Sequence, residues 1–276
     1  MAAICAHCGR QGLALKRCSN CKQASYCGAE CQKVGWKLHK KTCLTLREVN
    51  DKMHAAHLGD DWREVLRWEG RMDETMEGQS DAFCNSVLFI FAQAHAMGFN
   101  STGNRHHSNS IVRLDSQRVE VLGKMQRFRD QGEVLCRVAG QLIFLGERQQ
   151  AKDLFQRGRR VGEVHGFFSV ECRSCLGLGK LAGMDGRTEE GVELLRNALV
   201  CAPLSEGHAT SNELDALQDF TNALFSTHAI DEFEPLVLRY REAAKAESDK
   251  NGRLSFHDFH SFFMSARLHE VLASAP

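Results

Sequence analysis

The sequence lacks an excess of charge of either sign. Its 276 residues include 35 lysines and arginines and 35 aspartates and glutamates, so the formal net charge is zero. Proteins that bind nucleic acid, membranes or acidic ligands through their overall field usually carry such an excess. The balance therefore disfavours nucleic acid and membranes as partners of the chain as a whole.

The sequence also lacks a long apolar run. A membrane-spanning helix needs about 18 or more consecutive apolar residues, and no such uncharged run occurs. The start, MAAICAHCGR, has neither the charged beginning, the apolar run nor the small-residue cleavage site of a secretion signal. We therefore expect an intracellular protein, in the cytoplasm or the nucleus.

Motifs that would indicate catalysis are missing as well. The sequence contains no nucleophile elbow, no phosphate-binding glycine loop and no dinucleotide fingerprint. We therefore expect a protein that is not an enzyme.

Cysteine, in contrast, is abundant and unevenly placed. Seven of the 12 cysteines lie in the first 43 residues. In a reducing compartment, closely spaced cysteines are more often metal ligands than disulfides. These seven thiols and one histidine form four pairs at ligand spacing: Cys5 with Cys8, Cys18 with Cys21, Cys27 with Cys31, and His39 with Cys43.

The spacing of the four pairs suits zinc. C-x2-C lets one tight turn supply two thiolates, and an i, i+4 pair places two donors on one helix face. Because tetrahedral zinc takes four donors, eight donors predict two zinc sites. The spacing alone leaves open whether neighbouring or alternate pairs share an ion.

The order C-x2-C, C-x2-C, Y-C-x3-C, H-x3-C, closed by CQKVGWKLHKKTC, resembles the MYND zinc finger over residues 5–43. The resemblance implies that alternate pairs share an ion. It assigns one zinc to Cys5, Cys8, Cys27 and Cys31, and the other to Cys18, Cys21, His39 and Cys43. Both sites would be closed and therefore structural, and removal of zinc should unfold so small a segment.

Fingers of this family bind short proline-containing peptides, and a Gln and a Trp on the last helix commonly take part. The resemblance transfers these roles to Gln32 and Trp36. Trp36 could instead fill the small core of the finger. Nine basic side chains against Glu30 in residues 1–47 leave a nucleic-acid contact as a less favoured alternative.

Helical periodicity follows the finger, so the predicted fold is a small zinc-stabilised finger and then an all-α array. We predict three regions: a finger over 1–47, a helical segment over 48–130 and tetratricopeptide-like repeats over 131–276. The run Val87 to Phe91 is read as part of a buried helix, and the Gly-, Ser- and Asn-rich stretch 97–110 as an exposed loop.

An internal repeat supports the array. Small and apolar residues that mark a tetratricopeptide helix pair recur after 40 residues: Leu135, Val138, Ala139, Leu142, Gly146, Ala151, Phe155 and Gly158, then Cys175, Leu178, Gly179, Ala182, Gly186, Gly191, Leu195, Ala198 and Pro203. A weaker third copy involves Phe220, Ala223, Leu224, Tyr240 and Ala243. Because the family period is 34, we expect a longer loop near residues 164–171. Stacked helix pairs of this kind bind peptides or proteins.

Two further patterns are ambiguous. Glu247, Asp249, Asn251 and Asp258 occupy positions one, three, five and twelve of an EF-hand-like calcium loop, but Glu at the first position and Asp at the last depart from that pattern. A polar turn capped by Gly252 is the favoured reading. Cys172 and Cys175 form a single C-x2-C pair, which we interpret as core positions.

The function that these patterns favour is a zinc-binding adaptor, in which the finger recognises a short peptide and the helical repeats bind a second protein. The alternative is a divergent relative of the SET-domain lysine methyltransferases, which carry this finger and a similar tail, with residual cofactor binding or activity. In those enzymes part of the catalytic domain precedes the finger. Here four residues precede Cys5, and neither the Gly-rich cofactor turn nor the Asn-His-Ser-Cys segment is found.

Overall fold

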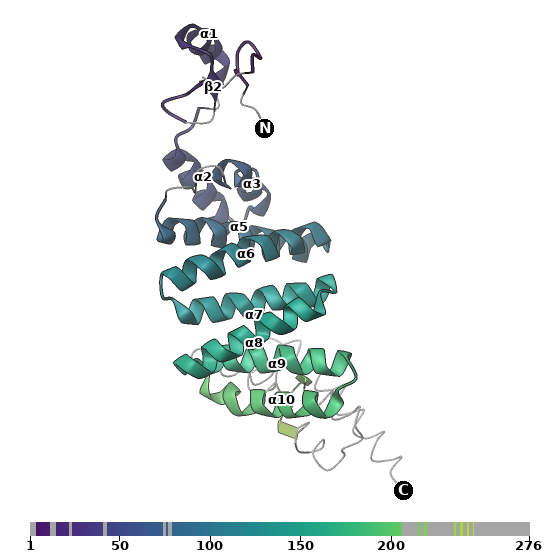
Figure 1. Cartoon of the computed structure of the whole chain (residues 1–276). Coiled ribbons are helices and arrows are strands. Elements are labelled where there is room, and N and C mark those ends of the chain that lie inside the picture. The colour runs from purple at the N-terminus through teal and green to yellow at the C-terminus, as the bar shows by residue number, and fades with distance from the viewer. Residues whose placement is uncertain are drawn as a thin grey trace. The chain divides into compact units, whose positions relative to one another are not determined.

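The structure is a computed structural model, shown in Figure 1. It describes residues 4–11, 15–21, 24–40, 43–73, 76 and 79–205, together with positions 215, 218, 219, 235, 238, 239, 242 and 245. The chain forms two compact units, residues 1–103 and 104–276. The predicted third repeat copy and the calcium-like loop over 247–258 lie outside the described residues. The boundaries at residues 47 and 130 remain predictions.

The first unit begins with the finger. Strands β1 (Lys16–Arg17) and β2 (Ser25–Tyr26) pair antiparallel, with Lys16 opposite Tyr26, and β2 leads into helix α1 (Ala29–His39). Helices α2 (Leu46–Leu58), α3 (Trp62–Leu66), α4 (Glu69–Asp73) and α5 (Asp81–Thr102) follow. A capping box begins α2: the Thr45 hydroxyl accepts from the Glu48 N–H, and the Glu48 carboxylate accepts from the Thr45 N–H.

Helix α5 supplies much of the core of this unit. Val87 and Phe91 are fully buried, which confirms the prediction of a buried helix here. The buried His95 places Nε2 3.1 Å from Glu69 Oε2 and so ties α5 to α4. By length and composition alone α5 could cross a membrane, and 44% of its most apolar window is buried within the protein. Polar residues such as Asn85 and Gln93 interrupt its apolar sequence.

The predicted loop over 97–110 is wrong. Helix α5 continues to Thr102, and α6 (Arg105–Lys124) begins three residues later. Gly103 adopts the left-handed conformation that glycine tolerates best, and the Asn104 side chain accepts a hydrogen bond from the His106 N–H. These two residues make the whole turn, so the other Gly, Ser and Asn residues of the stretch belong to helices.

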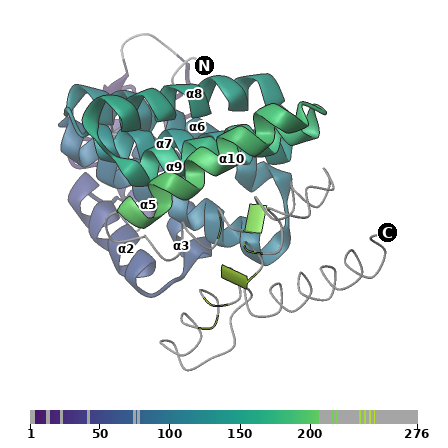
Figure 2. The ribbon, with the colours of Figure 1, turned by 90° about the horizontal axis from the view of Figure 1, so that it is seen from below.

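The second unit is a stack of antiparallel helices. After α6 come α7 (Phe128–Leu145), α8 (Arg148–His165), α9 (Phe168–Met184), α10 (Thr188–Cys201) and a short 3-10 turn, η1 (Ala202–Leu204). Each helix packs against the next along the stack (Figures 1 and 2). The described residues therefore confirm an all-helical array after the finger.

The 40-residue repeat has a different origin from the one predicted. Helix α9 begins 40 residues after α7, and α10 begins 40 residues after α8. The predicted longer loop near 164–171 is absent, because only Gly166 and Phe167 join α8 to α9. The residues by which this repeat exceeds the tetratricopeptide period lie in the helices and not in a loop. Helices α7 and α8 have 18 residues each.

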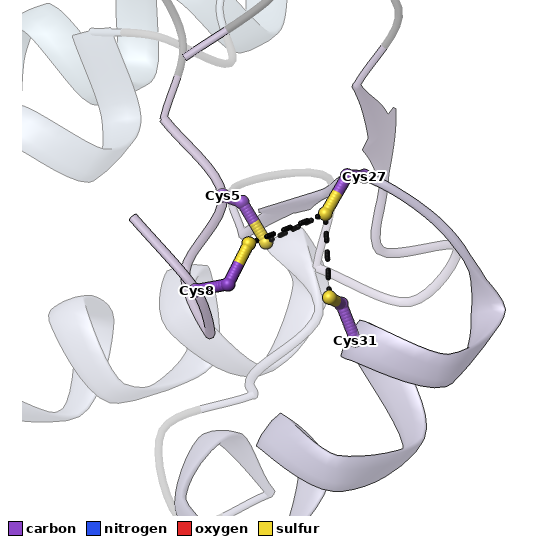
Figure 3. A group of neighbouring side chains, drawn as sticks. All are labelled: Cys5, Cys8, Cys27 and Cys31. Atoms are coloured by element: carbon purple, nitrogen blue, oxygen red, sulfur yellow. Dashed lines mark hydrogen bonds between the residues drawn. The ribbon is translucent and has the colours of Figure 1, made fainter. Parts of the chain in front are cut away.

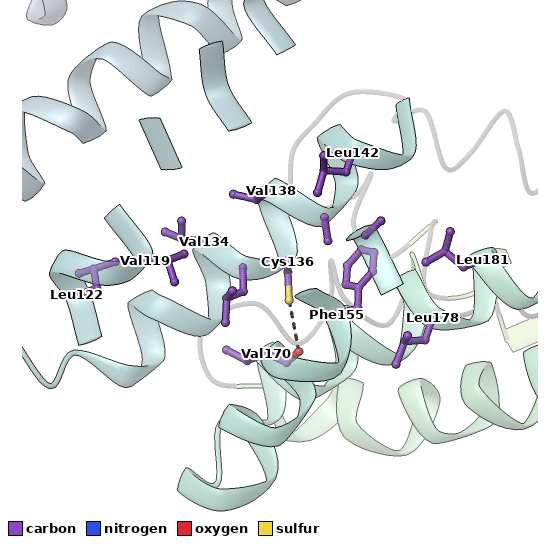
Figure 4. Close-up of a cluster of buried hydrophobic side chains, with 13 residues drawn as sticks. Val119, Leu122, Val134, Cys136, Val138, Leu142, Phe155, Val170, Leu178 and Leu181 are labelled. Carbon is purple, nitrogen blue, oxygen red and sulfur yellow. Dashed lines mark hydrogen bonds between the residues drawn. The ribbon is translucent and has the colours of Figure 1, made fainter. Parts of the chain in front are cut away.

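Small residues allow the paired helices to approach closely, as the sequence predicts. A Cβ atom on Gly179 would lie 2.8 Å from Leu195 Cγ and 3.2 Å from the Gly191 carbonyl oxygen. In the preceding pair, Ala139 and Ala151 are both fully buried. Around them, Cys136, Phe155, Leu178 and other side chains of α7, α8 and α9 form one continuous apolar core (Figure 4). Close packing of this kind makes cores sensitive to small changes of volume.

A buried ion cluster joins α6 to α7. Arg137 donates two hydrogen bonds of 2.7 Å to the fully buried carboxylate of Asp115, and Arg118 donates a third of 3.1 Å. Burial lowers the pKa of Arg118, although the nearby Asp115 carboxylate acts in the opposite direction. Such a cluster is costly to break, because loss of one partner leaves an uncompensated charge in the interior.

We therefore expect Asp115→Ala to destabilise the helical stack by about 3–5 kcal/mol. Glu193→Ala is the matched control: Glu193 forms an exposed pair with Arg196, and its loss should cost less than about 1 kcal/mol. Urea denaturation of the zinc-loaded chain, followed by circular dichroism at 222 nm, measures both. Equal losses of stability would contradict a structural role for the buried cluster.

Candidate metal centre

The first donor group brings together cysteines from two distant segments. Cys27 Sγ lies 3.4 Å from Cys8 Sγ, 3.5 Å from Cys5 Sγ and 3.3 Å from Cys31 Sγ (Figure 3). All four sulfur atoms lie within 4.8 Å of one another. The first and third pairs of the sequence therefore share one site.

A tight turn presents the first of these pairs. The Cys5 N–H donates to the Arg10 carbonyl at 2.9 Å, and the Gly9 N–H donates to the Cys5 carbonyl at 3.0 Å. Gly9 takes a positive φ of 72°, which glycine adopts without steric cost. The Ala6 N–H also donates to Ser25 in β2 at 2.8 Å, so the turn is held against the strand that leads to Cys27.

The second group is Cys18, Cys21, His39 and Cys43, whose donor atoms also lie within 4.8 Å of one another. Cys18 Sγ lies 3.8 Å from Cys43 Sγ, and Cys21 Sγ lies 3.4 Å from His39 Nε2. Helix α1 carries Cys31 near its start and ends at His39, so one helix contributes to both sites. The pairs alternate between the sites, which decides between the two pairings that spacing leaves open.

The donor geometry fits two zinc ions. Tetrahedral zinc with Zn–S bonds of about 2.3 Å places its sulfur ligands roughly 3.8 Å apart, whereas a disulfide needs a bond of about 2.05 Å. The observed separations are close to the zinc value, and all seven cysteines are free thiols. With four protein donors each, both sites are closed, so zinc here is structural.

The turns also change thiol acidity. Backbone N–H groups of Cys8 and His7 lower the pKa of Cys5 to about 5, against the opposing effect of burial. Burial acts to raise the pKa of Cys18, but hydrogen bonds from the Cys21 N–H, the His39 ring and the Asn20 N–H outweigh it and bring the value to about 6. Thiolates are the form that binds zinc, so these two positions are prepared for the metal.

Cys27 behaves differently because it lies between the other sulfurs of its site. Its hydrogen bonds to Cys31, Cys8 and Cys5 raise its pKa to about 12. The thiol proton of Cys27 must therefore leave when zinc binds, which couples metal affinity to pH in this site.

Tyr26, which the sequence analysis did not single out as the core of the finger, fills its centre. It is 1% exposed and makes an edge-on contact with the ring of the zinc donor His39, at 6.0 Å between centroids. Gly35 leaves room for it: a Cβ there would lie 3.1 Å from the Tyr26 ring. Trp36, in contrast, is 42% exposed and makes an edge-on contact with the ring of His39, at 5.7 Å between centroids.

Trp36 and Gln32 line one shallow groove of about 350 Å³. Lys33 and Ala29 of α1 contribute to the same groove, and the opposite wall is the turn from Cys18 to Asn20. The groove therefore touches the second zinc site directly. Lys33 and Asn20 were missed in the sequence, although Asn20 lies inside the C-x2-C turn that identifies the site.

Asn20 has a second role. Its Nδ2 donates to Cys43 Sγ at 3.3 Å, so it supports a zinc donor from outside the donor set. Groups of this kind orient metal ligands and stabilise their charge.

The remaining cysteines belong to the helical stack. Burial raises the pKa of Cys172 to about 12 and of Cys175 to about 11, and both are fully buried in α9. Among the described residues, only the two finger groups bring three or more metal donors together. This agrees with the interpretation of Cys172 and Cys175 as core positions.

Comparison with known proteins identifies the finger. Residues 5–43 match the model of the MYND finger, a span that contains all eight donors. The chain is similar to SET domain-containing protein 14 of Caenorhabditis elegans, with 34% identity over 81 residues, which is 29% of this chain and 18% of the relative. It is also similar to dauer abnormal formation protein 25 of the same organism, with 54% identity over 44 residues, 16% of this chain and 11% of the relative.

The N-lysine methyltransferase SMYD2 of mouse is a third relative, with 36% identity over 70 residues, 25% of this chain and 14% of the relative. The chain thus matches each of these three relatives over less than a fifth of the relative's length. The matches to methyltransferases are confined to the finger and the amino-terminal part of the chain.

Solved structures show the fold of the helical part. A protein from Podosopora anserina with nearly identical TPR-like repeats superposes with a TM-score of 0.53 at 16% identity, covering 73% of this chain and 96% of that one. A signal transduction ATPase with a tetratricopeptide repeat sensor, from Pyrococcus horikoshii, gives a TM-score of 0.60 at 13% identity, over 82% of this chain and 36% of that one. The array is therefore tetratricopeptide-like.

The contact of Asn20 with Cys43 yields a specific prediction. Asn20→Ala should weaken zinc retention roughly tenfold or more, because the thiolate loses its supporting donor. The measurement is the rate of zinc transfer from the native chain to a colorimetric chelator. Ser19→Ala, in the same turn, is the control and should leave the rate unchanged. A rate for Asn20→Ala equal to that of the control would exclude the supporting role.

Proposed function

We propose that the chain is a zinc-dependent protein-interaction adaptor with two binding modules. The finger takes a short proline-containing peptide, and the helical array binds a second protein. The observation that carries the proposal is the groove beside the second zinc site, in which the exposed Trp36 and Gln32 lie together.

The chemistry of this groove suits peptide recognition. Proline-rich segments adopt an extended conformation and dock on exposed aromatic rings, and a glutamine amide can pair with a peptide backbone. The groove offers one aromatic ring, the side-chain amides of Gln32 and Asn20, and the ammonium group of Lys33. Zinc holds the walls in place, since the turn from Cys18 and helix α1 both carry donors of the second site.

The helical array supports the second half of the proposal. Stacked helix pairs expose an extended surface whose main use is binding peptides or proteins. The free thiols of the finger require a reducing environment, so we place the protein inside the cell, in the cytoplasm or the nucleus.

The finger module is tested by Trp36→Ala and Gln32→Ala. Using a fluorescein-labelled set of proline-containing decapeptides, we expect Trp36→Ala to weaken the tightest interaction at least tenfold, or about 1.4 kcal/mol, because an aromatic anchor is lost. Gln32→Ala should have a smaller effect in the same direction. Fluorescence anisotropy with the zinc-loaded chain gives the affinities.

Leu38→Ala is the matched control for these variants. Leu38 lies on the same helix and is 79% exposed, but it is not part of the groove. It should bind every peptide as the unmodified chain does. Equal weakening by Leu38→Ala and Trp36→Ala, or no peptide binding by the unmodified chain, would refute the assignment of the groove.

The name of one relative, the N-lysine methyltransferase SMYD2 of mouse, favours a second candidate, a divergent lysine methyltransferase with residual cofactor binding. The adaptor proposal expects that isothermal titration of the zinc-loaded chain with S-adenosylmethionine shows no saturable binding. Saturable binding at micromolar concentration would favour the methyltransferase candidate instead.

A further inference from the structure

A second groove, of about 320 Å³, lies in the helical array and is separate from the finger. Helix α8 contributes most of its lining, and α9 and α10 contribute the rest. These three helices pack in succession in the stack (Figure 2). Neither zinc site nor the peptide groove shares a residue with it.

The lining of this groove combines an apolar part with charged side chains. Leu178 of α9 and Leu194 of α10 supply the apolar part, and both are mostly buried in the stack. Lys152, Arg159 and Arg160 of α8 supply three positive charges. The surface can therefore accept a ligand with both aliphatic and charged groups.

The two acidic residues in the lining are already paired with arginines. Glu163 accepts a hydrogen bond of 2.7 Å from Arg159, and Glu190 pairs with Arg187 at the start of α10. Their charges, together with that of Arg159, are thus balanced within the protein. What remains unbalanced in the groove is the positive charge of Lys152 and Arg160.

Neither of these two cations has a close acidic partner. Within the part of the chain that the structure describes, no ion pair includes Lys152 or Arg160. Lys152 does contribute, after Arg187 and Arg148, to lowering the pKa of Asp185. That carboxylate is hydrogen-bonded to Arg187 at 2.9 Å, so Lys152 is left available to another anion.

We propose that this groove binds an acidic peptide segment, with carboxylates against Lys152 and Arg160 and an aliphatic side chain over Leu178 and Leu194. Charge complementarity selects an acidic ligand. The two leucines favour a peptide with aliphatic side chains over a ligand that carries only charged groups. The inference rests on the proposed role of the array in protein binding and gives that role a surface and a partner chemistry.

The test uses the full zinc-loaded chain and a fluorescein-labelled peptide, Glu-Leu-Glu-Glu-Leu-Glu, in fluorescence anisotropy at low salt. We expect saturable binding that Arg160→Glu and Lys152→Glu each weaken at least fivefold. Arg157→Glu is the matched control, because Arg157 is an exposed arginine of the same helix that does not line the groove. It makes the same change of charge and should alter the affinity less than twofold.

Four results would overturn the inference. The first three are no binding of the acidic peptide, equal weakening by Arg157→Glu and Arg160→Glu, and equal affinity for the peptide with Gln in place of every Glu. The fourth is tighter binding of a labelled single-stranded RNA through Lys152 and Arg160, which would replace the peptide as occupant. None of these substitutions lies in the finger, so failure here leaves the test of Trp36 and Gln32 independent.

Discussion

Coordination of zinc by alternate donor pairs is the constraint on which the finger depends. The regular structure of the described finger residues is a two-stranded ladder, an isolated bridge between Ile4 and Gln11, and one helix of 11 residues, with Tyr26 as the large fully buried side chain. So small a core cannot offset the loss of chain entropy alone. Because the pairs alternate, each ion ties together segments that are far apart in sequence, and α1 joins both ions.

The same constraint creates the surface to which we assign function. Zinc is held by four protein donors at each site, so no position is left for a reacting water molecule. Its effect is instead geometric: it fixes the turn from Cys18 to Asn20 opposite α1, and the groove with Gln32 and Trp36 lies between them. Tyr26 occupies the core and leaves Trp36 exposed.

The helical array is stabilised by different physics. It buries a continuous apolar core, and small residues such as Gly179 and Gly191 let the backbones of a helix pair approach closely. Asp115 adds a buried charge cluster between α6 and α7. On the surface of α8, Lys152 and Arg160 take part in no ion pair among the described residues, and there we infer an acidic ligand.

The donor residues and the helical repeat could be predicted from the sequence, because ligand spacing and 40-residue periodicity are local patterns. The sharing of ions between pairs could not be predicted from spacing, since it depends on how β2 meets the turn at Cys5. The loop that composition predicts over 97–110 is wrong, because composition alone does not show that Gly103 and Asn104 suffice for the turn. The unbalanced positive charge of the groove on α8 depends on which acidic residues pair with Arg159 and Arg187, and that follows from the folded arrangement of the helices.

The central claim is that the finger contains two closed zinc sites and depends on both to fold. Native mass spectrometry of the reduced chain, with and without Cys18→Ser, tests this claim most directly. The account predicts two zinc ions in the unmodified chain. With Cys18→Ser it predicts one, or none if the finger unfolds as a unit. Zero or one ion in the unmodified chain would contradict the double site and assign these cysteines to redox chemistry instead.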